Sequence, residues 1–157
     1  MAPTSRIPID LPSALPRLLP LAVEWAERQS ASIRETGVAL DASAMQLAST
    51  VGVQHPERIR LTIVATIPLP ENDELRQAAV QSGLLGAGTI GLTLGYGIYL
   101  VEGRISDRLI RHECRHVYQY ERAGSIEAFL ARYVPEVLEF GYLDAPLEKD
   151  AREYEKA

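Results

Sequence analysis

The sequence has little of several features that mark common protein classes. Its single cysteine, Cys114, excludes an intramolecular disulfide and allows a reducing compartment. No run of about 18 or more apolar residues is present, so no transmembrane helix is expected. Prolines interrupt residues 1–25, where no basic segment precedes an unbroken apolar run, so no signal peptide is expected. These absences predict a soluble, cytoplasmic protein.

The chain also lacks a marked charge of one sign. Its formal net charge is -5, with no long block of like charges, which argues against nucleic acid or a membrane surface as a partner. Hydrophobic residues make up 46% and charged residues 24%, which is an ordinary globular mixture. The length of 157 residues, without repeats or linkers, predicts one domain over residues 1–157.

Local patterns predict an α+β fold, with helices packed on a small, mostly antiparallel sheet. Apolar periodicity and capping residues indicate helices over residues 13–36, 41–51, 73–82, 108–123, 126–140 and 147–155. Proline tolerance places the firm start of the first helix near Pro20, and Pro135 predicts a kink. Strands are expected over residues 58–66, 89–94 and 97–101, the last two joined as a hairpin. Residues 1–85 have no assigned role, and residues 86–157 would form a metal-binding core.

The most specific pattern is the pentapeptide HECRH, in which His112 and His116 flank Glu113. Side chains four residues apart on a helix lie on one face, so both imidazoles can hold one metal ion. Glu113 can then act as general base toward a zinc-bound water whose pKa the metal has lowered. Cys114 points away from the histidine face and is expected to be a small buried residue. The pattern lies inside a predicted helix and uses two of the three histidines.

A third protein ligand is required, because catalytic zinc sites usually combine three protein ligands with water. A histidine six residues after His116 would complete one known pattern, but that position is Arg122. The remaining histidine, His55, precedes a proline in a polar turn and is expected at the surface. The candidates are therefore acidic residues after the motif: Glu121, Glu127, Glu136, Glu139, Asp144, Glu148, Asp150, Glu153 and Glu155.

The helix expected over residues 147–155 holds the preferred third ligand. Glu148 opens this helix just after a turn, and Ala151 would let the helix approach the HECRH segment closely. Asp150 and Glu153 lie on the same helix and remain alternatives. Two imidazoles and one carboxylate suit zinc well among the divalent ions.

Roughly the last third of the chain resembles the gluzincin zinc metallopeptidases of the minimal kind, which carry HExxH and then E-x-x-A in the following helix. The resemblance implies a zincin-like active-site helix and one bound Zn²⁺. It carries the ligand roles over to His112, His116 and Glu148, and the general-base role to Glu113. Several gluzincins place an aspartate four residues after the ligand glutamate to orient a histidine. That position is Arg152 here, so another group must orient the histidine.

A peptidase also needs a group that stabilises the tetrahedral oxyanion. Four tyrosines near the motif are candidates, namely Tyr118, Tyr120, Tyr133 and Tyr142. Tyr142 is the first choice, because it lies in the loop before the preferred third ligand and can reach toward the cleft. The resemblance implies a peptide or protein substrate, which we expect along the strand at residues 97–101.

Two other functions compete with a zinc-dependent hydrolase. In the first, the same scaffold holds zinc as a regulatory or interaction module without turnover, since 157 residues leave few for a substrate cleft. In the second, the chain is a helix-rich interaction domain without a metal. The zinc-binding module predicts that Glu113→Gln changes little beyond stability, whereas the enzyme predicts loss of hydrolysis with zinc retained.

Overall fold

A small mixed sheet lies at the centre of the computed structural model, which describes residues 7–156. Within that range its strands are β1 (Val38–Ala39), β2 (Arg60–Val64), β3 (Gly91–Leu94) and β4 (Gly97–Val101), in the spatial order β1-β2-β4-β3. The β2–β4 pair is parallel, and the β1–β2 and β3–β4 pairs are antiparallel. The predicted α+β class is confirmed, and the short strand β1 was not predicted.

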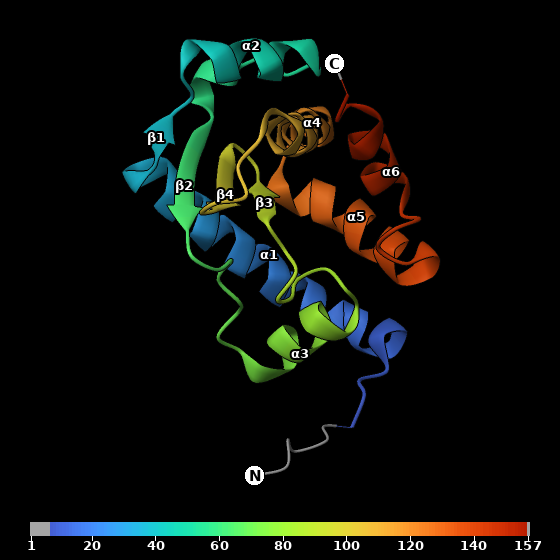
Figure 1. The fold of residues 1–157 in the computed structure, drawn as a ribbon. Coiled ribbons are helices and arrows are strands. Elements are labelled where there is room, and N and C mark those ends of the chain that lie inside the picture. Colours follow the sequence, from blue (N-terminus) through green and yellow to red (C-terminus); the bar gives the residue numbers. More distant parts are fainter. Residues whose placement is uncertain (1–6, 157) are drawn as a thin grey trace.

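Helices surround this sheet (Figure 1). They are α1 (Leu11–Thr36), α2 (Ala42–Thr50), α3 (Asp73–Gln81), α4 (Asp107–Ala123), α5 (Ile126–Phe140) and α6 (Pro146–Glu153), with a 3₁₀ turn at Pro56–Arg58. Aspartate, asparagine or serine side chains cap the first turns of the first five helices, as the sequence pattern predicted for all of them except α1. Among residues 7–156, no helix is both long and apolar enough to cross a membrane.

The first helix begins much earlier than proline tolerance predicted. Asp10 caps it by accepting a hydrogen bond from the amide of Ser13, and the helix continues through Pro16 and Pro20. Both prolines are exposed, so water can hydrate the carbonyls that lose their helical partners. Burial of Leu18 on the opposite face stabilises the helix there. Helix α5 likewise runs through Pro135 without a break.

The two faces of the sheet have separate apolar cores. Side chains alternate along β4, so that Ile98 and Leu100 pack with α2 and α4, whereas Tyr99 packs with α1. Helix α1 crosses its face closely, because a Cβ at Gly97 would lie only 3.1 Å from the Cβ of Ile33. Helix α5 packs against both α1 and α4, and α6 packs against α4. Helix α4 lies against β3, and α5 and α6 pack on α4.

The predicted hairpin is confirmed, but the prediction that a substrate lies along the strand at residues 97–101 is wrong. Gly95 turns the chain with φ +67°, and Leu94 pairs with Gly97. Strand β4, at Gly97–Val101, has β2 on one side and β3 on the other, so both of its edges are occupied. Its hairpin partner β3 (Gly91–Leu94) ends the sheet order and is the strand with an edge next to α4.

Candidate metal centre

Two helices bring the candidate ligands together. Helix α4 buries the face that carries Glu113 and His116, and it ends at Gly124 in the left-handed conformation. Helix α6 begins at Pro146 and turns Glu148 inward, so that its side chain is only 1% exposed. Ala151 is fully buried where α6 packs on α4, as expected for a close approach between the helices.

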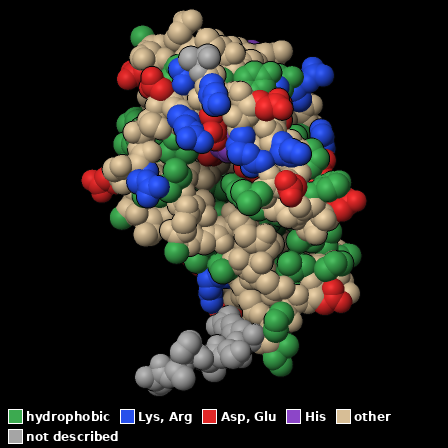
Figure 2. Space-filling view, turned by 45° about the vertical axis from the view of Figure 1, so that its right-hand side comes forward, with side chains coloured by type: hydrophobic (Ala, Val, Ile, Leu, Met, Phe, Trp, Pro, Cys, Tyr) green, Lys and Arg blue, Asp and Glu red, His purple; other side chains and the backbone are tan. Residues whose placement is uncertain are grey.

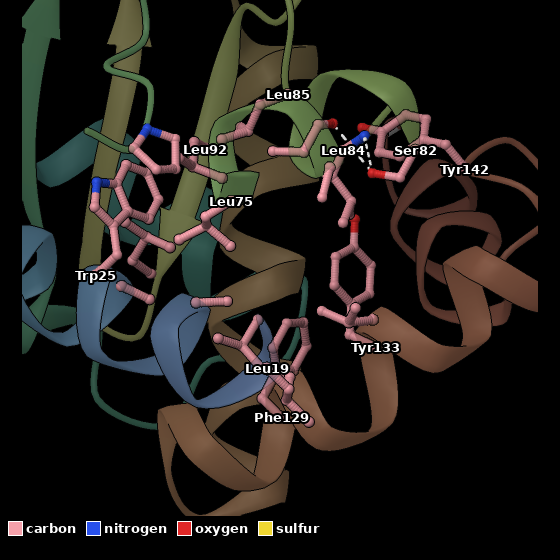
Figure 3. Close-up of a pocket in the computed structure, with 18 of the residues that line it drawn as sticks. Leu19, Trp25, Leu75, Ser82, Leu84, Leu85, Leu92, Phe129, Tyr133 and Tyr142 are labelled. Atoms are coloured by element: carbon pink, nitrogen blue, oxygen red, sulfur yellow. Dashed lines mark hydrogen bonds between the residues drawn. The ribbon is translucent and has the colours of Figure 1, made fainter. Parts of the chain in front are cut away.

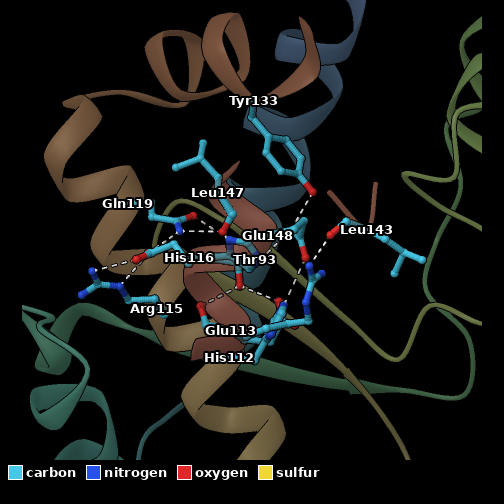
Figure 4. Close-up of polar contacts among 12 residues, drawn as sticks. Thr93, His112, Glu113, Arg115, His116, Gln119, Tyr133, Leu143, Leu147 and Glu148 are labelled. Atoms are coloured by element: carbon cyan, nitrogen blue, oxygen red, sulfur yellow. Dashed lines mark hydrogen bonds and ion pairs between the residues drawn. The ribbon is translucent and has the colours of Figure 1, made fainter. Parts of the chain in front are cut away.

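The predicted third ligand lies against both histidines (Figure 4). The Nε2 atom of His116 is 2.9 Å from one oxygen of Glu148, and the Nε2 atom of His112 is 3.3 Å from the other. One ligand atom from each of these three residues lies within 4.8 Å of the others. This is a set of two imidazoles and one carboxylate that could hold a metal ion.

Hydrogen bonds orient both rings from behind. The Nδ1 atom of His116 is 2.7 Å from Oε1 of Gln119, whose amide nitrogen donates to the carbonyl of Leu147 and to Asp150. That arrangement leaves only the acceptor oxygen of Gln119 facing the ring, so Nδ1 is the donor. The Nδ1 atom of His112 is 3.0 Å from a carboxylate oxygen of Glu155, which also only accepts. Both Nε2 atoms are therefore presented toward Glu148.

The electrostatics of this cluster favour a positive charge, supplied either by a proton or by a metal ion. A buried carboxylate next to two Nε2 lone pairs is unfavourable unless a proton or a metal ion lies between them. Burial opposes a charge on His116, but the neighbouring carboxylate of Glu148 outweighs that effect and raises the histidine pKa to about 9. For Glu148, burial favours the neutral acid, yet the histidines lower its pKa below the ordinary value. Oε1 of Glu148 is buried and accepts no hydrogen bond among the described residues.

Glu113 lies next to the ligand cluster in a fixed position. One of its carboxylate oxygens accepts a 2.9 Å hydrogen bond from the hydroxyl of Thr93, which also donates to the backbone carbonyl of Glu113. Its other oxygen faces Gly91, where an added Cβ would lie 2.8 Å away. Burial raises the pKa of the Glu113 carboxyl, while the two histidines act in the opposite direction. The edge strand β3 therefore sets the position of this carboxylate.

The four candidate tyrosines occupy different places. Tyr142 lines the same cavity as Glu113 and Glu148, and burial raises its pKa above the ordinary value. Tyr133 also lines this cavity and donates a 2.8 Å hydrogen bond to Glu148. Tyr120 also lines the cavity, but its hydroxyl is already used in a hydrogen bond to the carbonyl of Thr93. Tyr118 stacks on the guanidinium of Arg115 and does not line the cavity. The structure thus brings Tyr133 and Tyr142 to the candidate site.

The other acidic residues of α6 lie elsewhere. Asp150 pairs with Arg115 at 2.8 Å and accepts from Gln119, so it supports the site from behind instead of joining it. Glu153 is exposed. His55 is about half exposed and faces Glu57, as expected for a surface residue. Cys114 is fully buried, in agreement with its predicted packing role, and burial raises its thiol pKa to about 12.

Three residues support the site in ways that the sequence did not predict: Gln119, Thr93, and Glu155, which was only a candidate ligand. Gln119 follows His116 by three residues on one helix, so helical spacing could have revealed its contact with the ring. Glu155, which orients His112, lies beyond the end of α6, and no local pattern predicts that the chain returns there. Glu155 thus takes the orienting role that Arg152 cannot take. Thr93 lies on a strand, and only the tertiary fold decides which residues are its neighbours.

An apolar cavity adjoins the ligands. Glu113, His116 and Glu148 form part of its wall, and most of the remaining wall comes from apolar side chains of α1, α3, β3 and α5. The face turned forward in Figure 2 is hollowed, and acidic and histidine side chains are visible at the rim of the hollow beneath a group of Lys and Arg. The candidate ligands therefore face a space that a substrate could enter.

Comparison of the chain with protein-family models, with curated proteins and with solved structures finds no match. The resemblance to the gluzincins therefore stays a prediction that rests on the residues of the motif, to which the structure adds their arrangement. That arrangement has three parts: convergent imidazole and carboxylate groups, a neighbouring glutamate, and an adjacent cavity.

Proposed function

We propose that this chain is a zinc-dependent hydrolase, most specifically a small metallopeptidase. The observation that carries the proposal is the convergence of His112, His116 and Glu148 beside Glu113 at the wall of a cavity. The donor set fits zinc, because neutral imidazoles and a carboxylate are its usual partners in catalytic sites. The buried Oε1 atom of Glu148 supports the fit, because it accepts no hydrogen bond from the described part of the chain and faces Nε2 of His112 at 3.3 Å, where a cation would satisfy both atoms.

The chain's own residues have separable roles in this proposal. His112, His116 and Glu148 hold the metal, and zinc when bound supplies a Lewis acid that acidifies water and polarises a substrate carbonyl. Glu113 accepts the proton of the attacking water and passes it to the leaving amine, as general base and then general acid. Its buried position beside Thr93 keeps the carboxylate aimed at the reacting atoms.

The remaining polar groups stabilise and align these parts. Gln119 and Glu155 hold the two rings in the tautomer that leaves Nε2 unprotonated. Tyr142 projects from the loop before α6 into the cavity, where its hydroxyl can donate to the oxyanion that develops on the carbonyl oxygen. A peptide substrate would lie beside β3, the strand that ends the sheet order next to α4.

The first test is metal content, measured by inductively coupled plasma mass spectrometry on purified wild type, Glu148→Ala and Glu153→Ala. We expect about one zinc per wild-type chain, loss of most of it in Glu148→Ala, and no change in Glu153→Ala. The control residue lies on the same helix but is exposed and outside the ligand cluster. A wild type that stays metal-free after incubation with zinc would contradict the proposal.

The second test is hydrolysis, measured on a library of fluorogenic peptides with wild type and Glu113→Gln, each loaded with zinc. Removal of a general base typically lowers the rate by about 10²- to 10⁴-fold, so the variant should retain zinc and lose turnover. If both proteins hold zinc and neither cleaves any peptide, the proposed enzyme is wrong and the chain is a non-catalytic zinc-binding module.

A further inference from the structure

About half of the residues that line the cavity beside the candidate metal ligands come from residues 11–85, the part of the chain that carries no motif. Helix α1 contributes one continuous face, including Leu15, Leu18, Ala22 and Trp25, at the spacing expected for a helix that packs along the cavity. Helix α3 and the loop after it add leucines from the side. Figure 3 shows Leu19, Leu75 and Leu85 around one space, with Trp25 and Tyr142 on opposite sides of it in that view.

The size and lining of this cavity define the group that it can hold. Its volume is about 150 Å³, which is the size of a cavity that takes a benzene ring. Apolar side chains, chiefly leucines with Phe129 and Trp25, form most of the wall, and Glu113, His116 and Glu148 form part of its polar remainder. The space is thus mostly apolar with a few polar groups, as a pocket for one substrate side chain requires.

We infer that this cavity is the specificity pocket of the enzyme, and that it selects a peptide with a large apolar residue, aromatic or branched aliphatic, next to the scissile bond. The inference rests on the proposed function. A side chain held in the pocket places the neighbouring peptide bond beside Glu113 and the ligand cluster. Residues 11–85, which had no assigned role, thereby select the substrate.

A binding measurement tests the pocket without zinc or turnover. Trp25 is the single tryptophan of the chain and lines the cavity, so its fluorescence reports on the group that enters. The probe is the acetyl-amide of 4-bromophenylalanine, because bromine quenches an indole that it contacts. We expect saturable quenching of the metal-free protein by this probe and none by the acetyl-amide of alanine. Equal, non-saturable responses to both compounds would overturn the inference.

Substitutions on α1 test the same pocket with a matched pair. Ala22 lines the cavity, whereas its neighbour Leu21 is 36% exposed and does not. Ala22→Phe should abolish the quenching and Leu21→Phe should leave it unchanged, with equal zinc content in both variants. Quenching that persists in Ala22→Phe, provided that this variant is folded by circular dichroism, would place the probe elsewhere.

A variant that enlarges the cavity keeps the inference testable if Ala22→Phe, which fills the cavity, does not fold. Leu19→Ala enlarges the cavity, so it should shift the substrate preference toward a tryptophan or naphthylalanine residue next to the scissile bond.

In wild type we expect kcat/KM for phenylalanine or leucine at that position to exceed the value for alanine by roughly 10- to 100-fold. Cleavage without any such preference would refute the pocket and leave the hydrolase standing. Saturable quenching without cleavage of any peptide would support the pocket and refute the hydrolase.

Discussion

The C-terminal residues 107–155 and the N-terminal residues 11–85 contribute to the same cavity in different ways. The C-terminal region supplies polar groups in a connected hydrogen-bonding network, from Gln119 and Asp150 to the two histidines. The N-terminal region supplies mostly apolar side chains, as α5 of the C-terminal region also does, and their shared pattern is one helical face on α1. Reactive groups have strict requirements for type and spacing, whereas an apolar wall requires only suitable volume. A motif can therefore identify the first region but not the second.

This comparison predicts that substitutions in the C-terminal region change zinc binding, and that those in the N-terminal region change substrate selection. Strand β3 lies between the two regions along the chain. A substitution there, Gly91→Ala, has the largest expected effect, and it changes neither zinc binding nor substrate selection. A Cβ in Gly91→Ala would lie 2.8 to 3.0 Å from the Glu113 carboxylate and displace it. We expect hydrolysis to fall by about 10²- to 10⁴-fold with zinc content unchanged, because only the general base moves.

Gly88→Ala is the matched control for that substitution, since an added Cβ there meets no atom within 4 Å. Rates on one peptide and zinc content are measured for both variants. Activity in Gly91→Ala equal to that of Gly88→Ala would mean that Glu113 need not hold its observed position, and the proposed role for β3 would then be wrong.

An intermediate effect is expected where the histidines are oriented. Gln119→Ala and Glu155→Ala each remove the acceptor behind one ring, and such losses typically weaken metal affinity by about 10- to 100-fold. Zinc affinity is measured by competition with a chromogenic chelator, with Glu153→Ala as the control on the neighbouring surface. If either variant binds zinc as tightly as the control does, the contact behind that ring does not support the site.

The smallest effect is a pH dependence of the metal-free protein. The folded-state pKa of His116 is about 9, above its ordinary value of 6.5, so its interaction with Glu148 stabilises the fold fully below pH 6.5. This contribution is lost as the pH rises from 6.5 through 9. The melting temperature of the metal-free protein should fall over that window, and the fall should be weaker in the zinc-loaded protein. Parallel pH profiles of the two forms would argue against a zinc site at this pair.

The helix that carries the motif could be predicted closely because its signals are local. Ser106 caps it, Gly124 ends it, and the pair His112 and His116 fixes the inward face. The third ligand also followed from a local signal, since Glu148 stands in the first turn after Pro146. Its metal-binding role stays a prediction, which the zinc measurement checks.

Other features escaped prediction because they depend on contacts between distant segments. The helical start at Leu11 overrides two prolines, because the buried face around Leu18 outweighs the exposed lost hydrogen bonds. Whether β4 is an edge strand depends on its pairing with β2, in which Arg60 pairs with Gly97 although the two are far apart in the sequence. The role of Glu155 depends on a turn after the last helix that no periodicity describes.

The turn that holds Glu155 also bears on how a metal ion would enter and leave. Glu155 is held by Arg108 at 2.7 Å, and together they cover the His112 side of the cluster just past the last helical turn. Chain segments beyond a helix end open at a lower free-energy cost than a packed core does. Local opening there would uncover His112 while Glu148 and His116 stay buried, so metal exchange should follow the opening rate of this short segment and not global unfolding.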